Sequence, residues 1–292
     1  MSRRAVASFD RRALASQALQ ASVTARMRGQ LDFQSPICIY SLCKTLGVSV
    51  RFNSINMEGM YQRGSPPRIH LSALRPLPRR AYNCAHELGH HIFGHGSVID
   101  ELKEGAGANS WEDPKEFLAN TFAGFVLMPT LGMRAAFAAR GWDPEATDPR
   151  GLYEVACQFG VGYSTLITHL TYGLNMISCA RCATLQRTSP KAIRAMILGE
   201  PSAAPLVVAL PNWTSPTLDV EVGSHLLLPR GTVASCDIVI PIRTLAEGRL
   251  FEAIKPGIVQ ATHGDWAVFV RVMRKEYVGL ADYRHLEDDP DD

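Results

Sequence analysis

The chain of 292 residues lacks several features that would place it in a specialised class of protein. Its formal net charge is only +2, so no strong overall field draws it to nucleic acid or anionic lipid. Its cysteines number seven, an odd count, and no signal-peptide segment precedes them, so a secreted disulfide framework is not expected. Internal repeats are also missing. We therefore expect a cytoplasmic protein that buries a substantial core.

A long unbroken apolar run is missing as well. The most apolar stretch, residues 117–139, is interrupted by Asn120, Pro129 and Arg134. A membrane span needs about 20 mostly apolar residues without such interruptions. We therefore expect no membrane segment, but a buried helix that ends near Pro129 and a second helix after it.

The composition changes along the chain and predicts an α+β fold with two main parts. Residues 1–34 form a basic helix, which resembles an organelle transit peptide but is better explained as a solvated amphipathic helix. Residues 35–200 alternate helical patterns with short strands. Residues 201–285 carry short β-rich runs separated by Pro, Gly, Asn and Asp, which predicts a small all-β domain. The acidic residues 286–292 are expected to be a disordered tail.

Local signals place the elements of residues 9–128. Capping residues predict helices from Phe9 to Gln30, from Ser35-Pro36 to Gly47 and from Asp113-Pro114 to Met128. Two short strands, 48–52 and 68–71, enclose a loop rich in Gly, Ser and Pro. The segment 79–93 has apolar residues at helical spacing and ends at two glycines.

That last helix contains His86-Glu87-Leu88-Gly89-His90. Histidines four residues apart project from one helix face, so one Zn²⁺ ion can bind both rings. Glu87 lies beside them and can act as a general base on a water molecule. A surface helix can carry this pattern by chance, but the helical periodicity and a suitable third ligand favour a zinc site.

Two residues compete for the third ligand position. His95 is one residue out of register for the pattern that places three histidines on one ion, so we reject it as the ligand. Glu116 completes a His₂Glu site, and Asn120 shares its helix face. We expect Asn120 to accept the proton of the second nitrogen of a ligating histidine and so to fix its orientation.

These motifs resemble those of the ImmA/IrrE-type zinc metallopeptidases. The resemblance rests on Ala85-His-Glu-Leu-Gly-His90 and on Ala119-Asn-Thr-Phe-Ala123 leading to Leu127-Met-Pro129, and it spans about residues 35–175. It implies a zincin-like fold and an intracellular peptidase that cleaves or inactivates a helix-turn-helix repressor, in the setting of bacterial mobile elements and stress responses. Family members often have a further Glu just before Ala-Asn, where this chain has Leu118.

The segment 148–175 has the look of a helix-turn-helix pair. A recognition helix here would present Ser164, Thr165, Thr168 and His169, with no Arg or Lys for guanine or phosphate. Direct binding to nucleic acid is therefore possible but not favoured, and packing within the central domain is the preferred explanation.

The sequence thus predicts a regulatory zinc endopeptidase with Glu87 as the catalytic residue and a protein substrate. The alternative is a non-proteolytic regulatory module that binds DNA or protein around a structural or vestigial zinc site. The intact Glu87 favours the enzyme, because a structural site has no need of a general base. Tyr61, His91 and His95 are all candidates for the donor that stabilises the oxyanion.

Overall fold

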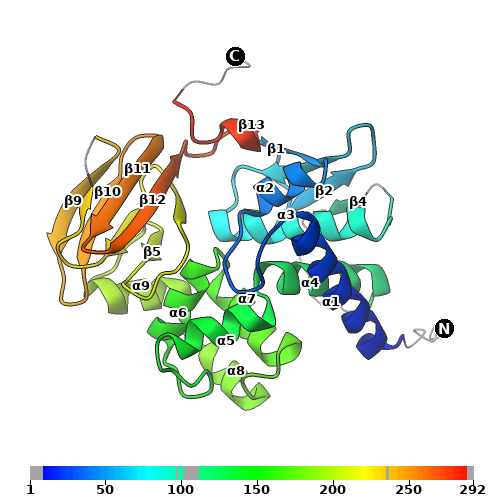
Figure 1. Ribbon diagram of the computed structural model, residues 1–292, viewed down its shortest axis with the longest axis horizontal. Helices are drawn as coiled ribbons and strands as arrows, with labels where there is room; N and C mark the ends of the chain where they lie inside the picture. The colour runs from blue at the N-terminus through cyan, green and yellow to red at the C-terminus, as the bar shows by residue number, and fades with distance from the viewer. Residues whose placement is uncertain (1–8, 97, 101–111, 235–236, 288–292) are drawn as a thin grey trace, which may run out of the picture.

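The computed structural model describes residues 9–96, 98–100, 112–234 and 237–287. It combines a mixed α/β half with a β half, and green helices lie below both (Figure 1). The helices are α1 (Arg11–Arg28), α2 (Ile39–Thr45), α3 (Leu77–Ile92), α4 (Pro114–Leu127), α5 (Thr130–Ala138), α6 (Pro149–Gln158), α7 (Tyr163–Thr168), the π-helix η2 (His169–Gly173), α8 (Cys179–Leu185), α9 (Pro190–Leu198) and the 3₁₀-helix η3 (Ala281–Tyr283). The strands are β1 (Ser49–Asn53), β2 (Gly59–Gln62), β3 (Arg68–Ser72), β4 (Val98–Asp100), β5 (Leu206–Val208), β6 (Thr217–Glu221), β7 (His225–Leu228), β8 (Val233–Ala234), β9 (Val239–Thr244), β10 (Arg249–Ala253), β11 (Gly257–His263), β12 (Trp266–Met273) and β13 (Gly279–Leu280).

The first sheet has the strand order β13-β1-β3-β2-β4 and supports helix α3. Strands β1 and β3 are parallel, whereas β2 is antiparallel to both β3 and β4. Apolar side chains of β1 and β3, such as Phe52, Ile69 and Leu71, are fully buried. Helix α3 packs on β2 and β3, which fixes the height of the motif helix above the sheet.

Two helix starts test the capping predictions. The Asp113 carboxylate accepts a hydrogen bond from the Lys115 amide at 2.8 Å, and Pro114 opens α4 as predicted. The start at Ser35-Pro36 is wrong, because α2 begins at Ile39. Asp32 accepts a hydrogen bond from the Ser35 amide, and the Ser35 carbonyl accepts from the Arg26 guanidinium, so this segment is held as a turn.

Helix α1 packs along one face and leaves most of its other residues exposed, so the basic N-terminal helix is only partly solvated. It lies against α4 and buries Ala18, Ala25 and Arg26. Arg26 is 1% exposed, and its Nε donates to the Val126 carbonyl in the last turn of α4 at 3.0 Å. This burial lowers the Arg26 pKa to about 10. A cation at the C-terminal turn of a helix is favoured by the helix dipole, so the arginine fastens α1 to α4.

The β half forms two four-stranded sheets, β5-β7-β10-β9 and β6-β12-β11-β8, with a shared apolar core. We expected residues 201–285 to be separate from the central domain, and this is wrong at the C-terminal end. Strand β13 pairs with β1 and so extends the first sheet (Figure 1). The reason is local packing, since the Tyr277 ring contacts Phe52 and the Arg284 guanidinium lies over the Tyr40 ring.

The most apolar stretch of the sequence forms most of helices α4 and α5, as predicted. The two helices are bent by 41° relative to each other at the break near Pro129. Within the described residues no single helix has the length and apolar character to cross a membrane, although this bent pair passes the same test together. The segment 148–175 folds as α6, α7 and η2, and buries Leu152, Val155 and Leu166. Of the expected acidic tail, residues 288–292 lie outside the described residues.

Candidate metal centre

The two motif histidines lie on the buried face of helix α3. His86 is 6% exposed and His90 is fully buried. Their Nε2 atoms lie 3.0 Å apart, as the spacing of four residues predicts. Two imidazole nitrogens at this separation can serve one ion.

Glu116 comes from the first turn of α4 and reaches both histidines. Its carboxylate oxygens lie 3.3 Å from His86 Nε2 and 3.4 Å from His90 Nε2. A tetrahedral zinc ion with bonds of about 2.0–2.1 Å sets its ligands roughly 3.3–3.4 Å apart. Each histidine–carboxylate distance has this length, although the two run to different oxygens of Glu116, and the two histidine nitrogens lie slightly closer. The two imidazoles and the carboxylate supply the donor set of a His₂Glu zinc site, and the three predicted ligands do lie together.

Gly89 allows helices α3 and α4 to approach this closely. A Cβ atom at this position would lie 3.1 Å from Ala119 Cα and 3.2 Å from the Phe122 ring. The distance to backbone is tighter than ordinary contacts, so a side chain here would push α4 outward. The glycine of the motif therefore sets the distance between the histidines and Glu116.

The carboxylate of Glu87 lies against strand β2. Glu87 is fully buried, and a Cβ atom at Gly59 would lie 2.6 Å from its Oε1 atom. Sequence reasoning assigned this strand to a loop and missed Gly59. In the structure Met57, Gly59 and Tyr61 are buried and alternate with partly exposed neighbours, but the sequence shows no matching alternation because Met60 is also apolar.

A comparison with protein-family models matches the part of the chain that contains these residues. Residues 43–171 match the model of a peptidase family described as the IrrE N-terminal-like domain. The chain therefore carries an IrrE N-terminal-like domain. This confirms the resemblance to the ImmA/IrrE-type family. The search of curated proteins found no match.

Within the IrrE N-terminal-like domain, His95 contacts His90 and is not part of the cluster that could hold a metal ion. Its Nδ1 lies 2.9 Å from His90 Nδ1, so it can hold the ring whose Nε2 faces Glu116. Burial, with a contribution from Lys115, lowers the pKa of His95. A neutral His95 can accept the His90 Nδ1 proton. His95, rejected as the third ligand from the sequence, thus lies in contact with His90.

The other oxyanion candidates form a pair of their own. The Tyr61 hydroxyl and His91 Nδ1 lie 2.8 Å apart, and their rings meet edge to face. Burial, followed by the charge of Arg28, lowers the pKa of His91. Each of the three candidates is thus engaged with a neighbouring side chain, and the choice of the oxyanion donor stays a prediction.

Asn120 lies on the predicted face of α4, but its recorded partner is Tyr82. The Tyr82 hydroxyl lies 3.3 Å from both the side-chain and the main-chain oxygen of Asn120. Burial raises the pKa of Tyr82, so the hydroxyl stays protonated and donates. Tyr82 precedes His86 by one helical turn, and the pair ties α3 to α4 beside the metal ligands. The proposed contact of Asn120 with a ligand histidine stays a prediction.

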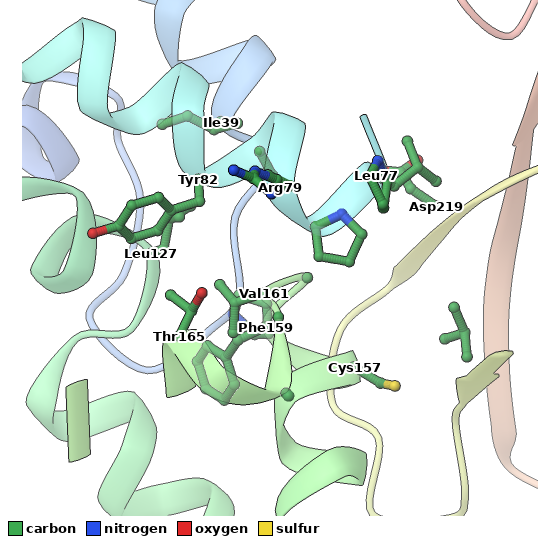
Figure 2. Close-up of a pocket in the computed structure, with 18 of the residues that line it drawn as sticks. Ile39, Leu77, Arg79, Tyr82, Leu127, Cys157, Phe159, Val161, Thr165 and Asp219 are labelled. Atoms are coloured by element: carbon green, nitrogen blue, oxygen red, sulfur yellow. The ribbon is translucent and has the colours of Figure 1, made fainter. Parts of the chain in front are cut away.

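A cavity of about 1590 Å³ opens beside the ligands and extends to the β half. His86, Glu116 and Asn120 line it, and so do all the residues of strand β6. In Figure 2, Arg79 and Tyr82 lie on one side of it and Phe159 and Val161 on the other. Pockets for small molecules measure about 300–1,000 Å³, so this space accommodates a larger ligand.

Proposed function

We propose that the protein is a zinc-dependent endopeptidase that cleaves a protein partner, such as a helix-turn-helix repressor. The observation that carries the proposal is the meeting of His86, His90 and Glu116 beside a large cavity, within an IrrE N-terminal-like domain. When bound there, zinc would polarise the scissile carbonyl and make water more acidic. The size of the cavity fits a polypeptide segment better than a small metabolite.

Each residue of the site has a separate role in the proposed reaction. His86, His90 and Glu116 would hold the ion, and His95 orients His90. Glu87 takes a proton from the attacking water and passes it to the leaving amine. Gly59 leaves the space in which its carboxylate lies. Tyr61 or His91 would donate a hydrogen bond to the oxygen of the scissile carbonyl as negative charge develops on it.

The experiment that tests the function is Glu87→Gln. Glutamine keeps the size of the side chain but cannot accept the proton, so cleavage should fall by about 10²–10⁴-fold while zinc content and fold persist. Zinc is measured by elemental analysis, and cleavage by incubation with purified helix-turn-helix repressors. Glu247→Gln is the control, because this exposed carboxylate pairs with Arg150 outside the ligand cluster.

The competing function is regulation by binding alone. Under that alternative, Glu87→Gln would keep its zinc and act on the repressor as the wild type does. That result would refute the peptidase proposal.

A further inference from the structure

Strand β6 lies at the edge of its sheet. In the order β6-β12-β11-β8 it pairs with β12 alone among the described strands, in parallel register. Its five consecutive residues all line the cavity that reaches the metal ligands. Since neighbouring side chains of a strand point to opposite faces, a cavity that touches every residue runs along the edge of the strand.

The hydrogen-bond phase shows which main-chain groups face that cavity. The Pro216 carbonyl accepts from the Phe269 amide, and the Val222 amide donates to the Met273 carbonyl, so the even-numbered positions bond to β12. In a parallel ladder the residues between them turn their N–H and C=O to the other side. The main-chain groups of Thr217, Asp219 and Glu221 therefore face the free edge.

Two serines occupy the ends of this edge. The Ser215 hydroxyl contacts both the amide and the carbonyl of Thr217. The Ser224 side chain accepts from the Glu221 amide, and its own amide donates to the Glu221 carbonyl. Between them, no main-chain hydrogen bond from another segment of the described chain reaches Asp219.

The side chain of Asp219 does not obstruct this position. Arg271, its neighbour across the ladder, donates two hydrogen bonds to the carboxylate at 2.7 and 2.6 Å. This bidentate pair holds the carboxylate on the face of the sheet, while the main chain stays at the edge. Figure 2 shows Asp219 on the strand side of the cavity.

We infer that an extended segment of the protein substrate pairs with the free edge of β6 at Asp219 and passes from there along the cavity to the metal ligands. Exchange of both main-chain hydrogen bonds with Asp219 would add one residue of substrate to the sheet, and this mode of recognition suits an extended chain of any sequence. The β half would thus form one wall of the substrate groove. The inference rests on the proposed function, because the segment is taken to belong to the peptidase substrate.

The test removes the Asp219 amide donor. Asp219→Pro and Asp219→Ala both lose the carboxylate, but only proline also loses the N–H, and proline is tolerated at a free edge. In the full chain carrying Glu87→Gln, the proline variant should bind fluorescein-labelled casein, an unfolded protein, about 3- to 10-fold more weakly than the alanine variant. Binding is measured by fluorescence anisotropy. Equal affinities, or no binding by the alanine variant, would overturn the inference.

A second measurement guards against a folding defect. Hydrogen–deuterium exchange of the β6 amides is followed in the Glu87→Gln chain with and without casein, and pairing should slow exchange at Asp219. Unchanged exchange at Asp219 would also overturn the inference. Repressor cleavage by the wild type with equal casein binding by the two Asp219 variants would refute the pairing and leave the function standing. No repressor cleavage by the wild type, together with weaker casein binding by Asp219→Pro than by Asp219→Ala, would refute the function and leave the pairing standing.

Discussion

Helix α3 meets helix α4 and the β half in contrasting ways. Toward α4 the contact is apolar and close, with the Gly89 position pressed against Ala119. Toward the β half it is ionic, since Arg80 pairs with Glu221 of β6 while its guanidinium lies over the Phe52 ring. The first contact fixes the distances of 3.0 to 3.4 Å between the candidate metal ligands. The second contact joins the helix to strand β6, which lines the cavity, so the same helix carries the candidate ligands and positions one wall of the cavity.

The ionic contact should give the largest effect on stability. Arg80 is 1% exposed and its partner Glu221 is 14% exposed as side chains, so Glu221→Gln leaves a buried charge without its counterion. The free energy of unfolding in urea should fall by about 3–5 kcal/mol. The double variant Arg80→Met with Glu221→Met should recover most of this loss, because no buried charge remains.

The control is the exposed pair Lys44–Asp282, which also joins the C-terminal segment to the central domain. Asp282→Asn should cost less than about 1 kcal/mol, as surface pairs do. If Glu221→Gln costs no more than Asp282→Asn, the ionic contact does not hold the two parts of the molecule together.

The opposite side of α4 should make stability depend on pH. His169 of η2 is packed against Gly124, and the His169 ring and the Met128 carbonyl are 2.9 Å apart. Burial lowers its pKa to about 4, so the unfolded chain binds a proton more readily than the folded one. Stability should therefore fall as pH drops from about 6.5 to 4, by about 3 kcal/mol from this residue.

His169→Gln isolates that contribution, because glutamine can donate to the same carbonyl but does not titrate. Urea unfolding with a chelator present, to exclude effects of metal binding, should show a weaker pH dependence in the variant. His285 also has a pKa lowered to about 4, mainly by burial, and its contribution remains in both proteins. Identical pH profiles for the two proteins would mean that His169 is accessible to protons in the folded state.

The sequence could predict the features that depend on local patterns, but not those that depend on contacts between distant segments. The histidine spacing of α3 and the capped start of α4 are local patterns, so the sequence predicts that His86, His90 and Glu116 meet, and the structure brings them together. Strand β13 is two residues long and pairs with a strand more than 200 residues earlier, so no local pattern marks it. Gly59 was missed for a related reason, since its role depends on the Glu87 side chain of another element.

Asn120 shows the limit of reasoning from a shared helix face. Its position beside Glu116 was predicted, but the recorded contact is with Tyr82. Periodicity says which face a residue occupies, and the neighbouring helix decides which partner it meets.

The apolar contact should give the smallest but most local effect, measured at the metal rather than in the fold. Gly89→Ala adds a methyl group 3.1 Å from Ala119 Cα, so α4 must move by a few tenths of an ångström and carry Glu116 with it. Zinc affinity, measured by competition with a chromophoric chelator, should fall by about 10- to 100-fold, as it does when residues that support metal ligands are changed.

Glu116→Ala sets the scale for loss of the ligand itself. Gly59→Ala is the matched glycine control, because its methyl group would meet the Glu87 carboxylate and not α4, so it should reduce cleavage while zinc affinity is largely kept. If Gly89→Ala binds zinc as tightly as the wild type, the close packing of α3 and α4 does not set the ligand geometry, and the contrast between the two sides of α3 loses its functional meaning.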